Sequence, residues 1–109
     1  MENFVSVLDY AKEQAPKPYK HTFLNTSRVL VGINVLAAGQ EQPIHDHQDQ
    51  DKFYFVVEGA GQFTVGDQTV PCGPGTLVLA PAGIDHGVKN SGPQRLVFLT
   101  TIAPGMAAG

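Results

Sequence analysis

The sequence predicts an all-β fold in which antiparallel strands close into a sandwich or barrel. Residues 28–36 alternate apolar with small or polar side chains, which is the period of two that a strand requires. Segments rich in β-branched and aromatic residues then recur along the chain, at residues 53–57, 62–65, 76–80, 86–89 and 95–101. Twelve glycines and eight prolines in 109 residues suit short strands joined by tight turns.

The segments between the predicted strands carry turn residues. Gly66 and Asp67 form the expected tip of a hairpin. Residues 73–75 and 90–93 combine glycine with proline, a composition that excludes a continuous strand. Connections this short make consecutive strands antiparallel neighbours.

A chain of 109 residues is long enough for one hydrophobic core, so we expect one domain spanning residues 1–109. Residues 1–18 are expected to form a short amphipathic helix and a linker, because apolar side chains recur at helical spacing until prolines interrupt them. Residues 20–102 hold the predicted strands. Residues 103–109 are small, and we expect a loosely held tail.

Composition excludes several classes of function. A net charge of -3 without a basic stripe argues against nucleic-acid binding. No apolar run approaches the roughly 20 residues that a membrane helix needs. Cys72 is the single cysteine, so no internal disulfide is expected, and the N-terminus does not read as a signal peptide. We therefore expect a cytoplasmic protein whose partner is a small molecule.

Three histidines are the candidate metal ligands. His45 and His47 are two residues apart, and side chains at that spacing on a strand share a face. His86 begins a later strand directly after residues 81–83, where a proline and a glycine favour a turn that would aim its side chain. Imidazole nitrogens suit iron, manganese, nickel, zinc and copper. Taken alone, the His-x-His pair is weak evidence for a metal site, because exposed polar strand residues give the same pattern.

The spacing around these histidines resembles the cupin family. Its first motif is Gly-x5-His-x-His-x3 or 4-Glu-x6-Gly, and Gly39 and Gly59 stand at the two glycine positions. Its second motif is Gly-x5-Pro-x-Gly-x2-His-x3-Asn, which this chain matches at every position, namely Gly75, Pro81, Gly83, His86 and Asn90. The resemblance is to the small single-domain, conserved-barrel cupins of the cupin 2 type.

Several expectations follow from the resemblance. The fold would be an antiparallel jelly-roll β-barrel, also called a double-stranded β-helix, with a short N-terminal helix. One divalent transition metal ion (Fe, Mn, Ni, Zn or Cu) would be held by His45, His47 and His86. Asn90 would cap its turn by bonding nearby backbone, which is a structural role. Because small cupins expose sheet edges and an apolar outer face, a homodimer is also expected.

One position departs from the family pattern. Counting back from Gly59, the family glutamate falls on Lys52, whose ammonium group has donors only and does not ordinarily bind a cation. Asp51 keeps the alternative spacing from His47, but a one-residue slip on a regular strand turns the side chain outward. Three interpretations stay open: Asp51 is the fourth ligand, water completes a three-histidine shell, or the pocket is metal-free and Lys52 contacts an anionic ligand.

Aromatic residues are expected to complete the pocket. Tyr54 shares a strand face with position 52 and would point into the barrel, whereas Phe53 and Phe55 would point to the opposite surface. Phe98 is the further pocket candidate. It alternates with its neighbours, and periodicity alone does not decide which alternate set faces the pocket.

The resemblance covers dioxygenases, isomerases, decarboxylases and non-enzymatic binding domains, and a fold does not choose among them. Three histidines with open coordination positions favour a small metal-dependent oxidoreductase of dioxygenase type that acts on a small organic molecule. The alternative is a non-enzymatic cupin that binds or senses a small ligand, with or without metal. The replacement of the family acid by Lys52 favours this alternative.

Overall fold

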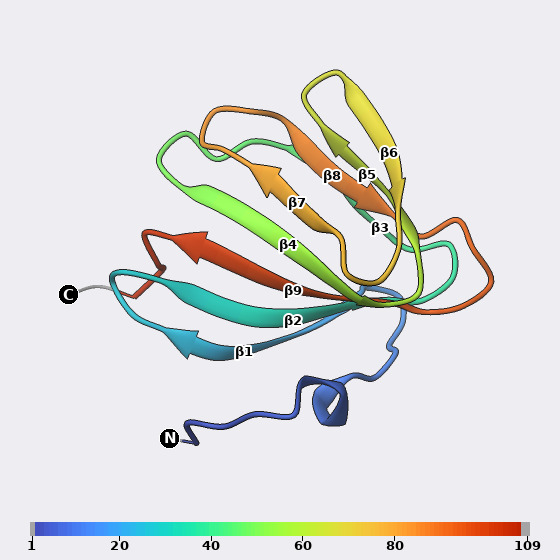
Figure 1. The fold of residues 1–109 in the computed structure, drawn as a ribbon, viewed down its shortest axis with the longest axis horizontal. Coiled ribbons are helices and arrows are strands. Elements are labelled where there is room, and N and C mark those ends of the chain that lie inside the picture. The colour runs from blue at the N-terminus through green and yellow to red at the C-terminus, as the bar shows by residue number, and fades with distance from the viewer. Residues whose placement is uncertain (1, 108–109) are drawn as a thin grey trace.

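The computed structural model describes residues 2–107, which form two antiparallel sheets folded over one another (Figure 1). A single 3-10 turn, η1, precedes nine strands in the described chain. The elements are η1 Val7–Tyr10, β1 Tyr19–Asn25, β2 Leu30–Leu36, β3 Glu41–His45, β4 Asp51–Glu58, β5 Gly61–Val65, β6 Gln68–Cys72, β7 Leu77–Ala80, β8 His86–Lys89 and β9 Leu96–Ala103.

The strand order confirms the predicted antiparallel jelly roll. One sheet has the order β1-β2-β9-β4-β7 and the other has the order β3-β8-β5-β6. The predicted hairpin tip at Gly66 and Asp67 joins β5 to β6, which pair antiparallel. The expected N-terminal helix is present only as the 3-10 turn η1.

The main core lies between the two sheets. Strand alternation sends Tyr54 and Val56 of β4 inward together with Leu96 and Phe98 of β9, and all four are fully buried. Phe63 of β5 meets them from the opposite sheet. The set of β9 that faces the interior is therefore the one that contains Phe98.

A second apolar cluster lies on the outer face of the five-stranded sheet. Ile33 and Val35 of β2 and Val97 of β9 are fully buried there. Val7 and Tyr10 of the N-terminal segment pack against them, and Figure 1 shows this segment running beside β1. The N-terminal segment thus covers the outer face of β2, which would otherwise be exposed to water.

Strands β4 and β7 expose apolar side chains on the same outer face. Phe53 and Phe55 of β4 are each 39% exposed, and Leu77 and Leu79 of β7 are 53% and 60% exposed. Phe53 stands opposite Leu79 in the register and Phe55 opposite Leu77, so the four side chains form one continuous patch. Neither the N-terminal segment nor any other described segment buries this patch.

The structure explains why the first motif ends in a glycine. Gly59 has a φ of +77°, and a Cβ atom there would lie 2.1 Å from the carbonyl oxygen of Arg95. Two hydrogen bonds join the described part of the tail to the rest of the chain: Gln50 Nε2 donates to the carbonyl of Pro104, and Met106 N donates to Asn25 Oδ1. Residues 108–109 lie outside the described part. No helix of the described residues is long and apolar enough to cross a membrane.

Candidate metal centre

Two of the three candidate histidines meet because their strands pair. His45 of β3 and His86 of β8 are directly opposite one another in the antiparallel register, and their ring centroids are 4.5 Å apart. The sequence predicted that His47 lies on the same strand as His45. In the structure β3 ends at His45, so His47 lies in the loop that follows. Its carbonyl accepts a hydrogen bond of 2.8 Å from the backbone N–H of Gly83, which ties its loop to the turn before β8.

The turn before β8 sets the direction of His86. The backbone N–H of Ile84 donates to the carbonyl of Pro81 at 3.2 Å and closes the turn. Gly83 supplies the left-handed φ of +80° that the turn requires. The side chain of His86 consequently points into the molecule, where it is 1% exposed.

The three imidazoles converge on a common space. The His47 ring centroid lies 5.0 Å from that of His45 and 5.6 Å from that of His86. Each ring offers one nitrogen, and these nitrogens all lie within 4.8 Å of one another. A metal ion at about 2.1 Å from each would draw them to roughly 3.4 Å in tetrahedral geometry, which small side-chain rotations can supply.

The hydrogen bonds of two rings leave the correct nitrogen free for a metal. Nδ1 of His45 lies 2.7 Å from the carbonyl of Pro43, and Nδ1 of His86 lies 3.0 Å from the carbonyl of Ile84. Since a carbonyl only accepts, Nδ1 carries the proton in each ring and Nε2 keeps its lone pair. His86 Nε2 is buried and has no hydrogen-bond partner in the described chain. A metal ion would satisfy this atom, so the residues fit the group that the family resemblance implies.

The electrostatics favour neutral imidazoles. Burial lowers the pKa of His47, and the nearby charges of Lys52 and His45 lower it further. Burial is also the main cause that lowers the pKa of His86. Both rings are therefore uncharged at pH 7, which is the form that binds a metal.

Lys52 occupies the place of the family acid inside the barrel. Its ammonium group lies 4.9 Å from the centre of the Tyr54 ring, a cation-π contact. Burial, assisted by the charge of Lys20, lowers its pKa from 10.5 to about 8. Within the described chain no carboxylate lies at ion-pair distance from it.

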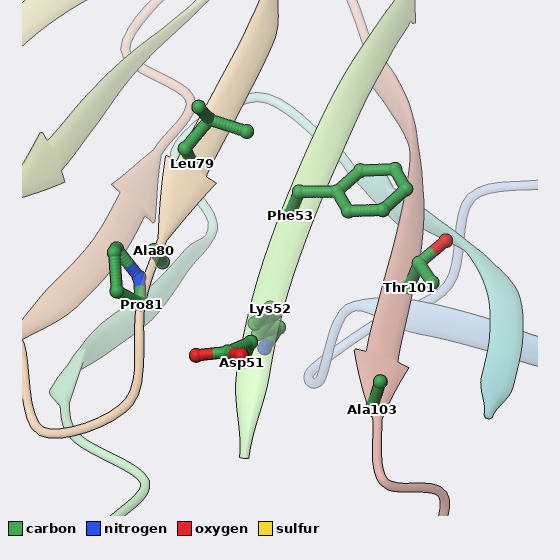
Figure 2. A pocket seen from close by; sticks show the side chains of 8 residues that line it. All are labelled: Asp51, Lys52, Phe53, Leu79, Ala80, Pro81, Thr101 and Ala103. Atoms are coloured by element: carbon green, nitrogen blue, oxygen red, sulfur yellow. The ribbon is translucent and has the colours of Figure 1, made fainter. Parts of the chain in front are cut away.

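The structure does not bring Asp51 into the histidine group. The alternation of β4 turns Lys52 inward and Asp51 outward. Asp51 Oδ1 instead accepts a hydrogen bond of 2.9 Å from the backbone N–H of Ala82. Figure 2 shows this carboxylate pointing toward Pro81, so the residue holds the turn that precedes His86.

The two aromatic pocket candidates lie in the core beside the histidines. Tyr54 is fully buried, its ring centroid is 6.2 Å from that of His86, and burial raises its pKa. Its hydroxyl has no partner in the described residues. Phe98 packs edge-on against Tyr54 with centroids 5.2 Å apart. Neither side chain is among those that line the adjoining pocket.

That pocket opens beside His45 and His47 and has a volume of about 570 Å³. Sequence reasoning missed Gln42, which lines it and whose Oε1 is buried without a partner among the described residues. Regular alternation would place positions 42 and 45 on opposite faces. A register shift between Gln42 and His45 brings both to the pocket, and no pattern in the sequence signals it.

The sequence model of the cupin domain family matches residues 32–102, and the chain belongs to this family. An uncharacterized protein of Streptomyces coelicolor is 39% identical over 64 residues, a match that spans 59% of this chain and 60% of that protein.

Solved structures agree with the family assignment. An uncharacterized protein with a double-stranded β-helix domain from Klebsiella pneumoniae is 27% identical, with a TM-score of 0.89 over 99% of this chain and 95% of that one. A predicted oxalate decarboxylase from Thermotoga maritima is also 27% identical. Its TM-score is 0.66, and the match covers 68% of this chain and 64% of that one.

Proposed function

We propose that His45, His47 and His86 hold one divalent transition metal ion (Fe, Mn, Ni, Zn or Cu) and that the protein is a metal-dependent enzyme. The observation that carries this proposal is the set of ring nitrogens within 4.8 Å of one another, one of them buried without a partner. With three protein ligands and no acid in the group, an ion would keep open coordination positions. A resident metal would supply Lewis acidity or oxygen activation.

The reaction type that we propose is a dioxygenase reaction on a small organic molecule, which makes the protein an oxidoreductase. The chain itself provides neutral ligands, a pocket of about 570 Å³ beside His45 and His47, and the apolar core around Tyr54 next to His86. The structurally similar Thermotoga protein is described as a predicted oxalate decarboxylase, which supports a small organic substrate.

The test begins with protein purified without a histidine tag. Bound metals are measured by mass spectrometry in the natural chain, in His86→Ala and in the control His21→Ala. His21 stacks on Tyr10 at 5.1 Å and belongs to no ligand group, so its removal should leave the metal content unchanged. Near-stoichiometric metal that is lost only in His86→Ala supports the metal proposal. Oxygen uptake with catechols, thiols and diketones then tests the reaction type.

A binding or sensing role is the second candidate, and Lys52 is the observation that favours it. Its ammonium group stands where the family has a glutamate, so the site lacks a charge-neutralising ligand and a general base. Sub-stoichiometric metal in the natural chain would end the enzyme proposal and leave this one. Stoichiometric metal with oxygen consumption would do the reverse.

The homodimer also stays a proposal. The patch formed by Phe53, Phe55, Leu77 and Leu79 supports it, because exposed apolar side chains on neighbouring strands commonly mark a protein interface. Light scattering on the eluted protein tests it. A monomer mass at micromolar concentration would refute a stable dimer.

A further inference from the structure

We propose that the pocket beside His45 and His47 binds a small organic anion and that Lys52 provides the ammonium group that pairs with it. This inference names the ligand class of the site in the proposed function and rests on that site, although the pairing itself does not require a metal ion. It follows from the charges that line the pocket and from the unpaired state of Lys52.

The pocket lining carries an excess of positive charge. Lys17, Lys20 and Lys52 line it, whereas Glu41 is the one acidic residue of its lining. A divalent cation on the histidines would add to this excess. A concave site lined by one sign of charge concentrates ligands of the opposite sign. The field of the pocket therefore favours an anionic organic ligand.

Of the three lysines that line the pocket, Lys52 is the one whose ammonium group is most in need of a negatively charged partner. The ion pair that the described chain contains joins Arg95 to Glu58, which stands at the opposite end of β4 from Lys52. No hydrogen bond from the Lys52 ammonium is present in the described chain, and its contact is with the Tyr54 ring at 4.9 Å. The side chain is half-buried, so its charge is partly removed from water without an ion-pair partner in the described chain.

No nearby acid of the chain can serve as this partner in the observed arrangement. Asp51 precedes Lys52 but points to the opposite face of β4, where it accepts from Ala82 N. Glu41 lines the pocket yet is an exposed residue at the start of β3, and it is not within ion-pair distance of a lysine. Within the described residues the Lys52 ammonium therefore has no carboxylate partner and is available to an anion that enters the pocket.

The position of Lys52 fits a role in specificity. Lys52, His45 and His47 line the same pocket, so an anion paired with the ammonium would lie beside the proposed metal ligands. A volume of about 570 Å³ admits a small molecule and falls within the range of ligand sites, roughly 300–1,000 Å³. Because Lys20 also lines the pocket, a second carboxylate of the ligand would have a second ammonium group to pair with.

The test compares an anion with its uncharged analogue on metal-free protein. Succinate and succinamide share a skeleton and differ in charge, and each is titrated calorimetrically at pH 7 and low ionic strength. We expect saturable binding of succinate and none of succinamide. Lys52→Met should weaken succinate binding on the order of 10- to 100-fold, which is less than for a fully desolvated charge pair because Lys52 is half-buried.

Two further variants separate charge from folding. Lys89→Met removes a lysine that is exposed on β8 and does not line the pocket, so its affinity should stay within about twofold of the natural chain. Lys52→Arg retains the charge and should bind better than Lys52→Met. Glycerol phosphate in place of succinate decides whether a phosphate is accepted as well.

The outcomes are distinct from those of the metal test. Succinate binding that depends on Lys52 supports the inference even if the chain never takes up a metal. Equal affinity in Lys52→Met and Lys89→Met, equal binding of succinamide, or no anion binding at all overturns it. A stoichiometric metal content alongside any of those three results would leave the metal proposal standing.

Discussion

Replacement of Lys52 by methionine should stabilise the metal-free protein at pH 7. Burial lowers the pKa of this lysine from 10.5 to about 8, a difference of about 2.5. At 1.36 kcal/mol per pKa unit, this corresponds to roughly 3 kcal/mol of destabilisation while the group is charged. Methionine has a similar length and carries no charge, although it loses the contact of the ammonium with the Tyr54 ring. We therefore expect a gain of about 2–3 kcal/mol.

The gain should depend on pH with a definite sign. Between pH 8 and about 10.5 the unfolded chain binds more protons than the folded one, so the stability of the natural chain rises with pH over this window. The advantage of Lys52→Met is therefore full below about pH 8 and falls away toward pH 10.5.

Urea denaturation of both proteins at pH 7 and pH 10 measures this difference. Effects of other groups cancel in the comparison, and Lys89→Met controls for the loss of a surface charge. A difference that is the same at both pH values would refute the reasoning. So would a variant that is less stable than the natural chain at pH 7.

Three further changes test other parts of the site. Lys52→Glu restores the family acid, so isothermal titration should show that the affinity for a divalent metal rises at least about tenfold. Unchanged affinity would contradict the inward placement of position 52. Asp51→Ala removes the acceptor for Ala82 N and should lower the free energy of unfolding, measured by urea denaturation, by about 1 kcal/mol. It should also weaken metal binding, because the turn before His86 loses this hydrogen bond. Wild-type metal affinity in that variant would show that the turn holds without the carboxylate. Asn90→Ala leaves buried backbone groups unpaired and should cost about 2–4 kcal/mol, whereas a loss under 1 kcal/mol would contradict its structural role.

The three histidines could be proposed as one group from the spacing of the two motifs, although in the structure His45 and His86 meet through the pairing of β3 with β8. His86 follows a turn whose proline and glycine are visible in the sequence, and the second motif fixes its spacing. The inward position of Lys52 and the outward position of Asp51 follow from the alternation of one regular strand. The turn before His86 and the alternation of β4 each depend on a few neighbouring residues.

Other features depend on contacts that a sequence does not display. β1 was not predicted because Tyr19–Asn25 mixes charged and polar residues with aromatics, and its pairing to β2 decides its conformation. The register shift in β3 that brings Gln42 to the pocket likewise depends on β8. His47 lies past the end of β3, so its approach is set by the hydrogen bond to Gly83 rather than by strand alternation.

The central claim is that three imidazoles from separate parts of the chain hold a single ion. Anomalous diffraction from crystals grown with zinc or manganese tests it most directly. We expect one peak in each chain, about 2.0–2.3 Å from a ring nitrogen of His45, His47 and His86. Rings that diverge from one another, or a peak that lies outside their reach, would contradict the claim.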